Sequence, residues 1–583
     1  MTKQACRLLI YFFFLNLSAA ETDIGGDKMF LDYDVRIKKE NPDRILMTAR
    51  IGPIPVNHLL LAMTQNYGRV ETLSEIIPEI SIYGAGRKSV EIKKNNEFLW
   101  EVDLPVSDTV CIDYAINTRH PYTSLNSVRL PYRDADHLYL PAASAFVHPD
   151  EKYLADNKIK IQRIRIHFDI PDEWTTATSW GSNRLAYELS PSSLETLNNG
   201  LIGAGCYRVH SFKVKELPVE VAILNVGPCP DEEIVRIVEQ ALIAGHDLFN
   251  FFPVSRVFAL IQFIFDQPGR GSGNALGWSI NLNYGRTFDS LDWIKETAHI
   301  FHEIFHFWNG TAISRAQSDH SLIWFTEGVT RFYQYKNMQR SGIISEEKYF
   351  QYISREYTDV FQSSRREDSL KSISGDYYAD RSAMALTYSK GCCLAFALDL
   401  LLQHAFSGLK NFDSVMKKIL EKYDFRVNRH CLTHDELDGV FYEILGKGLY
   451  PSYLRLRNCD FLQEFQSTLL SAGLEIEKTR GRRLYFGILD FGPPSDHLQA
   501  FKIDRESPAY QAGLREQDIL LEINNWKVKD IPDVKKALQG MKENESANLI
   551  IERKNVKMRM RIPWHSFETR FNIKKIRNQS QFK

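Results

Sequence analysis

Residues His302-Glu303-Ile304-Phe305-His306 form the pattern HExxH, and the motif Trp324-Phe325-Thr326-Glu327-Gly328 follows it along the chain. Two histidines four residues apart on a helix lie about 40° apart around its axis, so both imidazoles can reach one metal ion. A carboxylate from a second helix, that of Glu327, would complete a three-ligand zinc site with one open position. The two motifs therefore predict a pair of helices that meet at a metal.

A short pattern such as HExxH also occurs by chance, and an apolar helix with two histidines is usually only a core helix. Here the apolar residues between 304 and 308 predict a largely buried helix. Histidine and glutamate without partners would be costly in such a helix, so the metal site is the favoured interpretation. His299 and His320 lie nearby but fit no ligand role, and we expect them beside the site or at the surface.

The chain has 583 residues, a length that predicts several domains. Its formal net charge is −1 and it contains no long basic or acidic run. This composition argues against nucleic acid or an anionic membrane as a main partner.

The first twenty residues differ from the rest of the chain. Lys3 and Arg7 precede an apolar run at 8–17, and small residues at 18–20 follow it. This arrangement is typical of a signal peptide, and the run is too short for an ordinary membrane span. The sequence predicts cleavage after Ala20 and export to the periplasm or the medium, with no membrane attachment afterwards; a retained N-terminal anchor is the alternative.

Seven cysteines would remain after cleavage, and none forms a CxxC pair. Their spacing therefore describes no zinc knuckle, and it assigns no disulfide pairing. Cys392 and Cys393 fall in an apolar helical run, where we expect packed side chains rather than nucleophiles.

The hydrophobic pattern changes along the chain. Residues 21–170 alternate apolar and polar side chains in short segments, which predicts an antiparallel β domain. Residues 171–344 combine expected strands at 219–224, 258–265 and 279–284 with a helix at 231–250, a glycine-rich loop at 268–277 and the two motif helices. Residues 345–479 read as helical, 478–483 as a basic linker, and β character returns from 484 to about 564.

These residues suit hydrolysis of a peptide bond by zinc-activated water, with one zinc ion held by His302, His306 and Glu327. Glu303 would act as the general base and pass the proton to the leaving amine. An oxyanion forms during this reaction and needs a donor. Tyr388, in Thr387-Tyr388-Ser389-Lys390-Gly391, is our candidate for that donor.

Three segments, HEIFHFWN at 302–309, WFTEGVTRFY at 324–333 and TYSKG at 387–391, resemble the glycyl aminopeptidase family of gluzincin zinc metallopeptidases. The resemblance implies Glu303 as base and Tyr388 as transition-state donor. It also implies a multidomain α+β chain with a peptide or protein substrate. The implied domains are a β-rich N-terminal domain at 21–170, a thermolysin-like catalytic domain at 171–344, a helical domain at 345–479 and a PDZ domain at 480–566. The residues themselves indicate the signal peptide at 1–20 and a basic tail at 567–583.

The segment 507–524 resembles the characteristic stretch of a PDZ domain, in which a short helix ends at a glycine and a strand leads to a turn. Such domains take a peptide C-terminus by strand addition, and a loop near residues 485–488 would hold its carboxylate. The alternative is a PDZ fold that only supports the enzyme.

Members of the resembled family carry a Gly-Gly-x-Glu-His element beside the zinc, whose glutamate is expected to hold the free α-amine of the substrate. The corresponding residues here include Gly271, Gly273 and Asn274, and no acidic residue. The glycines suit close approach of an extended substrate, so these three residues are the predicted substrate-binding positions. Aminopeptidase and endopeptidase activity both stay open.

Two functions follow from these features. The first is an exported zinc metallopeptidase. The second is a PDZ-based peptide-binding or scaffolding protein with a vestigial peptidase domain, suggested by the missing acidic residue. The complete set of two histidines, two glutamates and a tyrosine favours the first.

Overall fold

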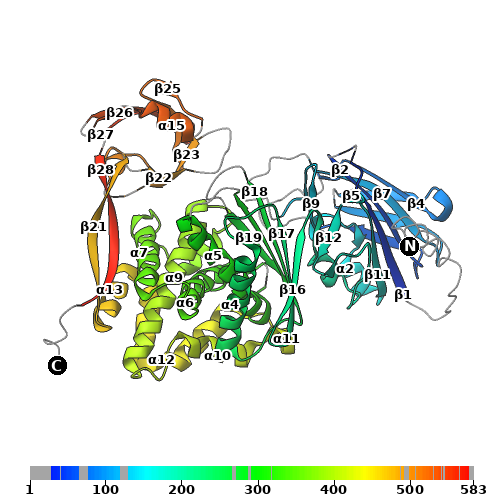
Figure 1. Cartoon of the computed structure of the whole chain (residues 1–583), viewed down its shortest axis with the longest axis horizontal. Helices are drawn as coiled ribbons and strands as arrows, with labels where there is room; N and C mark the ends of the chain where they lie inside the picture. Colours follow the sequence, from blue (N-terminus) through cyan, green and yellow to red (C-terminus); the bar gives the residue numbers. More distant parts are fainter. Residues whose placement is uncertain are drawn as a thin grey trace. The chain divides into compact units, whose positions relative to one another are not determined.

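The computed structural model describes residues 28–576 apart from 40, 42, 65–75, 97, 119–128, 266–270, 286–289, 317, 486–487, 492–497, 504, 506, 530, 540, 543–544 and 564. The predicted signal peptide and the end of the predicted tail, 577–583, lie outside the described residues. The chain divides into two compact units, the first holding most of the chain up to Gly205 and the second most of the remainder (Figure 1).

The first unit is built from β-sheets, as the alternating pattern predicts. A six-stranded sheet runs in the order β14-β11-β1-β2-β7-β4, and a four-stranded sheet in the order β10-β3-β6-β5. Inward side chains alternate with outward ones along β1, whose Leu31, Tyr33 and Val35 are buried. The strands of these sheets are β1 (Lys28–Arg36), β2 (Arg44–Gly52), β3 (His58–Ala62), β4 (Glu79–Gly84), β5 (Glu91–Asn96), β6 (Leu99–Asp103), β7 (Val110–Asn117), β10 (His148–Pro149), β11 (Lys160–Asp169) and β14 (Ala186–Glu188).

The first compact unit extends past the expected domain boundary at residue 170 and continues to Gly205, apart from a short segment at 177–182. Strand β15 (Leu201–Gly205) pairs with β9 (His137–Pro141), and β14 pairs with β11. Backbone hydrogen bonds to strands far back in the sequence thus hold this segment in the N-terminal unit.

A five-stranded sheet in the order β16-β17-β18-β20-β19 begins the second unit. The expected strands appear as β17 (Leu217–Leu224), β18 (Val257–Phe265) and β20 (Ser279–Gly285), beside β16 (Arg208–Val214). The glycine-rich segment differs from its prediction as a loop. Residues Gly271–Leu276 form strand β19, which pairs antiparallel with β20 along its whole length. Its glycines are therefore part of an edge strand.

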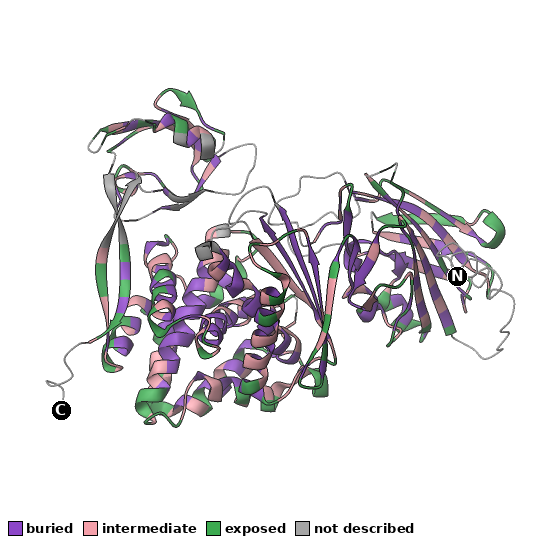
Figure 2. Cartoon of the chain, viewed as in Figure 1, coloured by how far each residue is buried: buried purple, intermediate pink, exposed green. Residues whose placement is uncertain are grey.

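Two helices pack beside this sheet. Helix α4 (Asp231–Phe249) begins with three acidic residues, which suit a helix N-terminus, and ends at Asn250 in the left-handed conformation. Helix α5 (Ser290–Phe305) carries the HExxH motif. A Cβ atom on Gly245 of α4 would lie 2.3 Å from the Trp308 ring, so the glycine lets this fully buried indole pack directly against the helix backbone. Figure 2 shows the continuous buried core between these elements.

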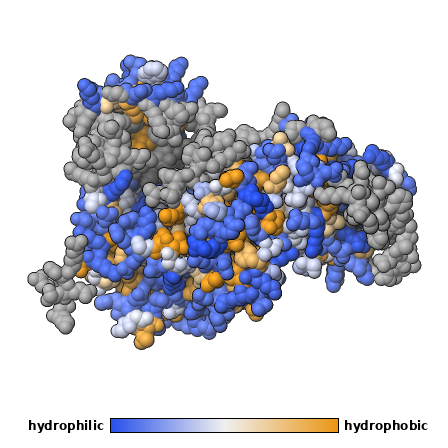
Figure 3. Space-filling view, viewed as in Figure 1, coloured by the Kyte–Doolittle hydropathy of each residue, from blue (hydrophilic) through white to orange (hydrophobic). Residues whose placement is uncertain are grey.

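A layer of helices completes the catalytic part of the second unit and confirms the helical prediction. Figure 3 shows that hydrophilic side chains cover most of its visible surface. Its longest helix, α9 (Arg381–Ala405), is long and apolar enough to cross a membrane, but 78% of its most apolar window is buried inside the structure, as expected of a core helix. The other helices are α6 (Thr330–Arg340), α7 (Glu346–Gln362), α8 (Leu370–Gly375), α10 (Phe412–Tyr423), α11 (Phe425–Asn428), α12 (His434–Arg457) and α13 (Phe461–Ser471).

The C-terminal part contains a sheet with its own apolar core, as expected for a PDZ domain. Its strands, in sheet order, are β22 (Ile488–Phe491), β23 (Leu498–Ile503), β24 (Ile519–Ile523), β26 (Ser546–Arg553) and β27 (Val556–Pro563). Part of the predicted carboxylate loop, residues 486–487, lies outside the described residues. The expected linker at 478–483 and the start of the expected tail are strands instead. They belong to β21 (Leu474–Tyr485) and β28 (His565–Lys575), which pair antiparallel across the two ends of this domain.

The structure also gives the state of the cysteines. All seven cysteines after residue 20 are free thiols, and Cys392 and Cys393 are fully buried in α9, as their apolar setting predicts. Burial raises the pKa of both thiols well above the ordinary value, so they stay protonated.

Candidate metal centre and active site

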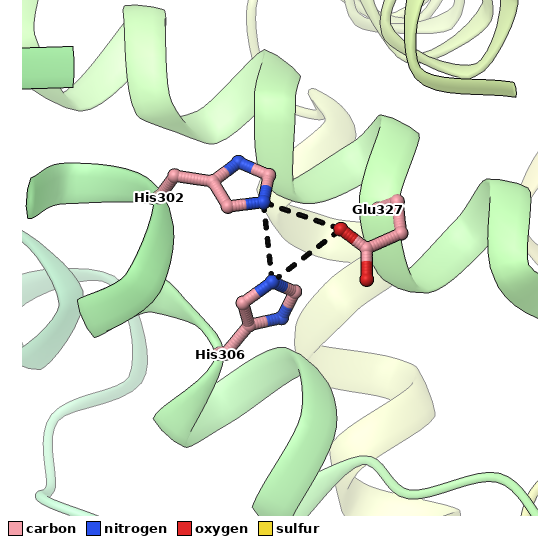
Figure 4. Close-up of side chains that lie close together, drawn as sticks. All are labelled: His302, His306 and Glu327. Carbon is pink, nitrogen blue, oxygen red and sulfur yellow. Dashed lines mark hydrogen bonds and ion pairs between the residues drawn. The ribbon is translucent and has the colours of Figure 1, made fainter. Parts of the chain in front are cut away.

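Helix α5 and the π-helical turn η7 (Trp324–Val329) bring His302, His306 and Glu327 together (Figure 4). The Nε2 atoms of the two histidines lie 3.2 Å apart. The Glu327 Oε2 atom lies 3.3 Å from Nε2 of His302 and 3.6 Å from Nε2 of His306. In the described part of the chain, these three side chains form a group whose potential ligand atoms all lie within 4.8 Å of one another.

These separations fit a tetrahedral metal ion. Ligand atoms about 2.0–2.1 Å from a zinc ion lie about 3.3 Å from one another at tetrahedral angles, which matches the three distances. Two imidazoles and one carboxylate are also the donor set of a catalytic zinc with an open fourth position. The three residues therefore fit zinc in both chemistry and spacing.

Both imidazoles use Nδ1 for a hydrogen bond outside the cluster, so Nε2 faces the other two side chains of the cluster. Nδ1 of His302 donates to Oε1 of Gln334 at 3.0 Å, and Nδ1 of His306 donates to the Asn309 carbonyl at 3.1 Å. The Asn309 amide in turn donates to the Phe325 carbonyl at 3.0 Å and so links the end of the HExxH segment to η7. Such outer hydrogen bonds set the histidine tautomer and the ring orientation of metal ligands.

Electrostatic coupling within the cluster is strong. Burial lowers the pKa of His302 to about 4. Burial would also lower the pKa of His306, but Glu327 outweighs it and raises that pKa to about 9. Burial would raise the pKa of Glu327, yet the two imidazoles hold it well below its ordinary value. The cluster thus presents an ionised carboxylate and one neutral imidazole, and a metal must displace the proton of the other.

Glu303 lies on the next stripe of α5 and faces strand β19. A Cβ atom on Gly273 would stand only 2.5 Å from Oε1 of Glu303, so glycine at this position lets the carboxylate lie against the strand backbone. Gly271, two residues earlier on the same strand, leaves similar space for the Glu296 carboxylate. The Oε2 atom of Glu296 lies 2.9 Å from Nδ1 of His299. In the sheet order β19 stands at the end, next to β20, and its Gly273 lies beside Glu303.

Tyr388 of α9 lies on the other side of the histidines. Its ring centroid is 5.9 Å from that of His302, and its hydroxyl lies 2.9 Å from the Tyr377 hydroxyl. Burial, followed by the charge of Glu327, raises the pKa of Tyr388 well above its ordinary value. The phenol therefore stays protonated and can donate a hydrogen bond at neutral pH.

A close helix contact sets this tyrosine beside the ligands. A Cβ atom on Gly391 of α9 would lie 2.7 Å from the Trp324 carbonyl and 2.9 Å from Cα of Gly328. A Cβ atom on Gly328 would likewise lie 2.6 Å from Cα of Gly391. Only glycine at both positions lets α9 and η7 approach this closely.

The structure thus brings together His302, Glu303, His306, Glu327 and Tyr388, and places Gly271 and Gly273 beside them. Asn274 is different. It follows Gly273 on a strand, so its side chain points to the sheet face opposite Glu303.

The sequence did not indicate four residues that lie around these side chains. Gln334 contacts His302, and Tyr377 and Arg331 contact Tyr388. Glu356 pairs with Arg331. A polar residue within the apolar stretch after Glu327 is the signal that would have indicated Gln334. His320 packs against Tyr378 with ring centroids 5.0 Å apart, outside the ligand cluster.

Family comparisons agree with this site. A model described as M61 glycyl aminopeptidase matches residues 296–391, which include every predicted metal and catalytic residue. A model of the Peptidase M61 N-terminal domain matches residues 33–197, and a PDZ domain model matches residues 502–553. The resemblance predicted from the motifs is confirmed. A search of curated proteins gave no match.

A solved structure shares the fold. An aminopeptidase N family protein from Idiomarina loihiensis is 16% identical, with a TM-score of 0.76, and the match covers 94% of this chain and 98% of that one. An M1 zinc metallopeptidase from Deinococcus radiodurans is 14% identical with a TM-score of 0.44, covering 74% of this chain and 94% of that one.

Substitution Gly391→Ala tests the helix contact. The added methyl must push α9 away from η7, and displacements of about 1 Å in an active site cost about a hundredfold in rate. We therefore expect a large loss of kcat for peptide hydrolysis and weaker zinc binding, measured by chelator competition. Gly439→Ala, in α12 with open space around its Cβ position, is the matched control and should change neither. Wild-type kcat in Gly391→Ala would show that the contact does not position the site.

Proposed function

We propose that this zinc metallopeptidase, which carries the N-terminal and catalytic domains of the M61 glycyl aminopeptidase family and a PDZ domain, hydrolyses peptide bonds with Glu303 as general base and Tyr388 as oxyanion donor. The observation that carries the proposal is the convergence of the three ligand atoms within 3.2–3.6 Å, with Glu303 and Tyr388 on either side. His302, His306 and Glu327 would hold one zinc ion, which when bound supplies a Lewis acid that activates water.

The chain's own residues perform the proton transfers. The Glu303 carboxylate, against the backbone of β19, takes a proton from the attacking water and later delivers it to the leaving amine. The protonated phenol of Tyr388 donates a hydrogen bond to the oxyanion that develops on the substrate carbonyl. A set so complete favours an active enzyme over a vestigial domain that only supports a peptide-binding PDZ groove.

The edge strand favours an extended substrate. A substrate in extended conformation along β19, the last strand in the sheet order, would have its backbone beside Glu303. Gly271 and Gly273 allow this backbone to lie close to the helix that carries Glu303. No residue of β19 is acidic, so the strand offers no charge to a free α-amine.

Substitution Glu303→Gln tests the base. It keeps the shape of the side chain but removes its proton affinity, and general-base groups contribute about a hundredfold to ten-thousandfold in rate. We expect kcat on a mixed peptide library to fall within that range while the zinc content stays at the wild-type level. Turnover by the variant equal to that of the wild type would contradict the proposed mechanism.

Acetylation of the substrate tests the choice of cleavage position. Because β19 lacks a carboxylate for the α-amine, we expect N-acetylated peptides to be hydrolysed with kcat/KM within about tenfold of their free counterparts, since a lost charged contact costs more than that. Mass spectrometry of the products identifies the cleaved bonds. Stepwise loss of N-terminal residues from free peptides alone, with acetylated peptides untouched, would establish an aminopeptidase instead.

Export is part of the proposal, because Lys3, Arg7 and the apolar run at 8–17 have the order of a signal peptide. We expect the mature protein to begin at Glu21 and to be recovered outside the cytoplasm. N-terminal sequencing of the protein from each cell fraction checks this, and an intact Met1 in exported protein would point to a retained anchor.

A further inference from the structure

An ion pair with a buried carboxylate lies against the Tyr388 ring. The Arg331 Nη1 atom is 3.1 Å from Oε1 of Glu356, whose side chain is only 2% exposed. The mechanism proposed above assigns neither residue a role. Buried pairs of this kind add little net stability relative to apolar side chains of similar volume, so the pair invites a functional explanation.

Glu356 is fixed from several directions. The Tyr335 hydroxyl donates to its Oε1 atom at 2.7 Å, and the Ser389 hydroxyl donates to its Oε2 atom at 2.6 Å. Burial alone would raise the pKa of Glu356, but Arg331 and these hydroxyls hold it below the ordinary value. The carboxylate is therefore ionised, and Ser389, the neighbour of Tyr388 on α9, ties it to the helix that carries the phenol.

Arg331 connects this carboxylate to the phenol ring. Its guanidinium carbon lies 4.7 Å from the Tyr388 ring centroid, within cation–π range. Arg331 follows Glu327 by four residues, one helical turn, so both side chains project from the same face of the continuous η7–α6 helix. A single helix thus presents the zinc ligand to the metal and a cation to the tyrosine.

Tyr377 holds the phenol from the other end. Its hydroxyl lies 2.9 Å from the Tyr388 hydroxyl, and its ring centroid is 6.2 Å from the Tyr388 ring. The face of the Tyr388 ring is therefore fixed by Arg331 and its oxygen by Tyr377. A phenol restrained at both places loses little entropy when it donates to an oxyanion.

We propose that Arg331, anchored by Glu356, is a positioning residue that orients the Tyr388 phenol and strengthens it as a hydrogen-bond donor, with Tyr377 fixing the same hydroxyl. A positive charge over the ring draws electron density from the phenol oxygen and so polarises its O–H bond. This inference rests on the proposed function, because it acts only through Tyr388.

A double-mutant cycle tests the inference in the full-length zinc enzyme. We expect Arg331→Gln to lower kcat by about tenfold, a part of the hundredfold or more that a lost oxyanion donor costs, with KM and zinc content near the wild-type values. In a Tyr388→Phe background the same substitution should change kcat less than about twofold. A purely structural role for Arg331 would instead lower kcat by the same factor in both backgrounds, and that result overturns the inference.

Two further variants keep the test decisive. Arg340→Gln removes another ion pair of α6, with Asp413 at 2.6 Å, and should leave kcat unchanged. If Arg331→Gln does not fold, Tyr377→Phe removes one oxygen and should lower kcat in the wild type but not in Tyr388→Phe; equal losses in both overturn the inference.

The outcomes also separate this inference from the function on which it rests. Equal turnover by the wild type and Glu303→Gln overturns both. Wild-type turnover above that of Glu303→Gln, with multiplicative effects of Arg331→Gln and Tyr388→Phe, overturns only the positioning role.

Discussion

The close contact between Gly328 and Gly391 is the constraint on which the active site depends. Both glycines lie in helices, and either Cβ atom would meet backbone atoms of the other helix at 2.6–2.9 Å. The contact puts η7, with Glu327, and α9, with Tyr388, at backbone contact distance. The proposed metal ligand Glu327 and the proposed oxyanion donor Tyr388, from helices far apart in sequence, are thereby brought to one site.

Around this contact the protein arranges charged and polar groups in successive layers. The innermost layer is the cluster of His302, His306 and Glu327, in which opposite charges offset the cost of burial. Gln334 and Asn309 form the next layer and set the tautomers of the histidines. The Arg331–Glu356 pair lies further out, against the Tyr388 ring. The outer residues contact the inner ones, so the geometry of the site depends on these outer contacts as well as on the three side chains of the cluster.

Local patterns predicted those elements whose identity depends on neighbouring residues. We could predict β17, β18 and β20 from their apolar runs and α4 from its amphipathic pattern. Such patterns are visible in consecutive residues, because strands and helices each have a characteristic hydrophobic period. Strand β19, strands β21 and β28, and the extension of the N-terminal unit to Gly205 could not be predicted in this way. Strands β21 and β28 and the segment up to Gly205 pair with strands far away in the sequence, as Leu474 does with Lys575. Strand β19 forms a hairpin with the adjacent β20, but its glycine-rich sequence lacks the apolar alternation of a strand.

The sequence by itself determined the proposed chemistry of the centre, since the spacing of His302, Glu303 and His306 on one helix suits two zinc ligands and a base. It also determined Glu327 and Tyr388 as candidates through the motifs around them. Only the tertiary structure decided that Gly271 and Gly273 lie beside the two glutamates of α5, that Asn274 points away, and that Arg331 reaches the tyrosine ring. The physical reason is that residue type and helical spacing are local, whereas the approach of two helices or a strand edge depends on the packing of distant segments.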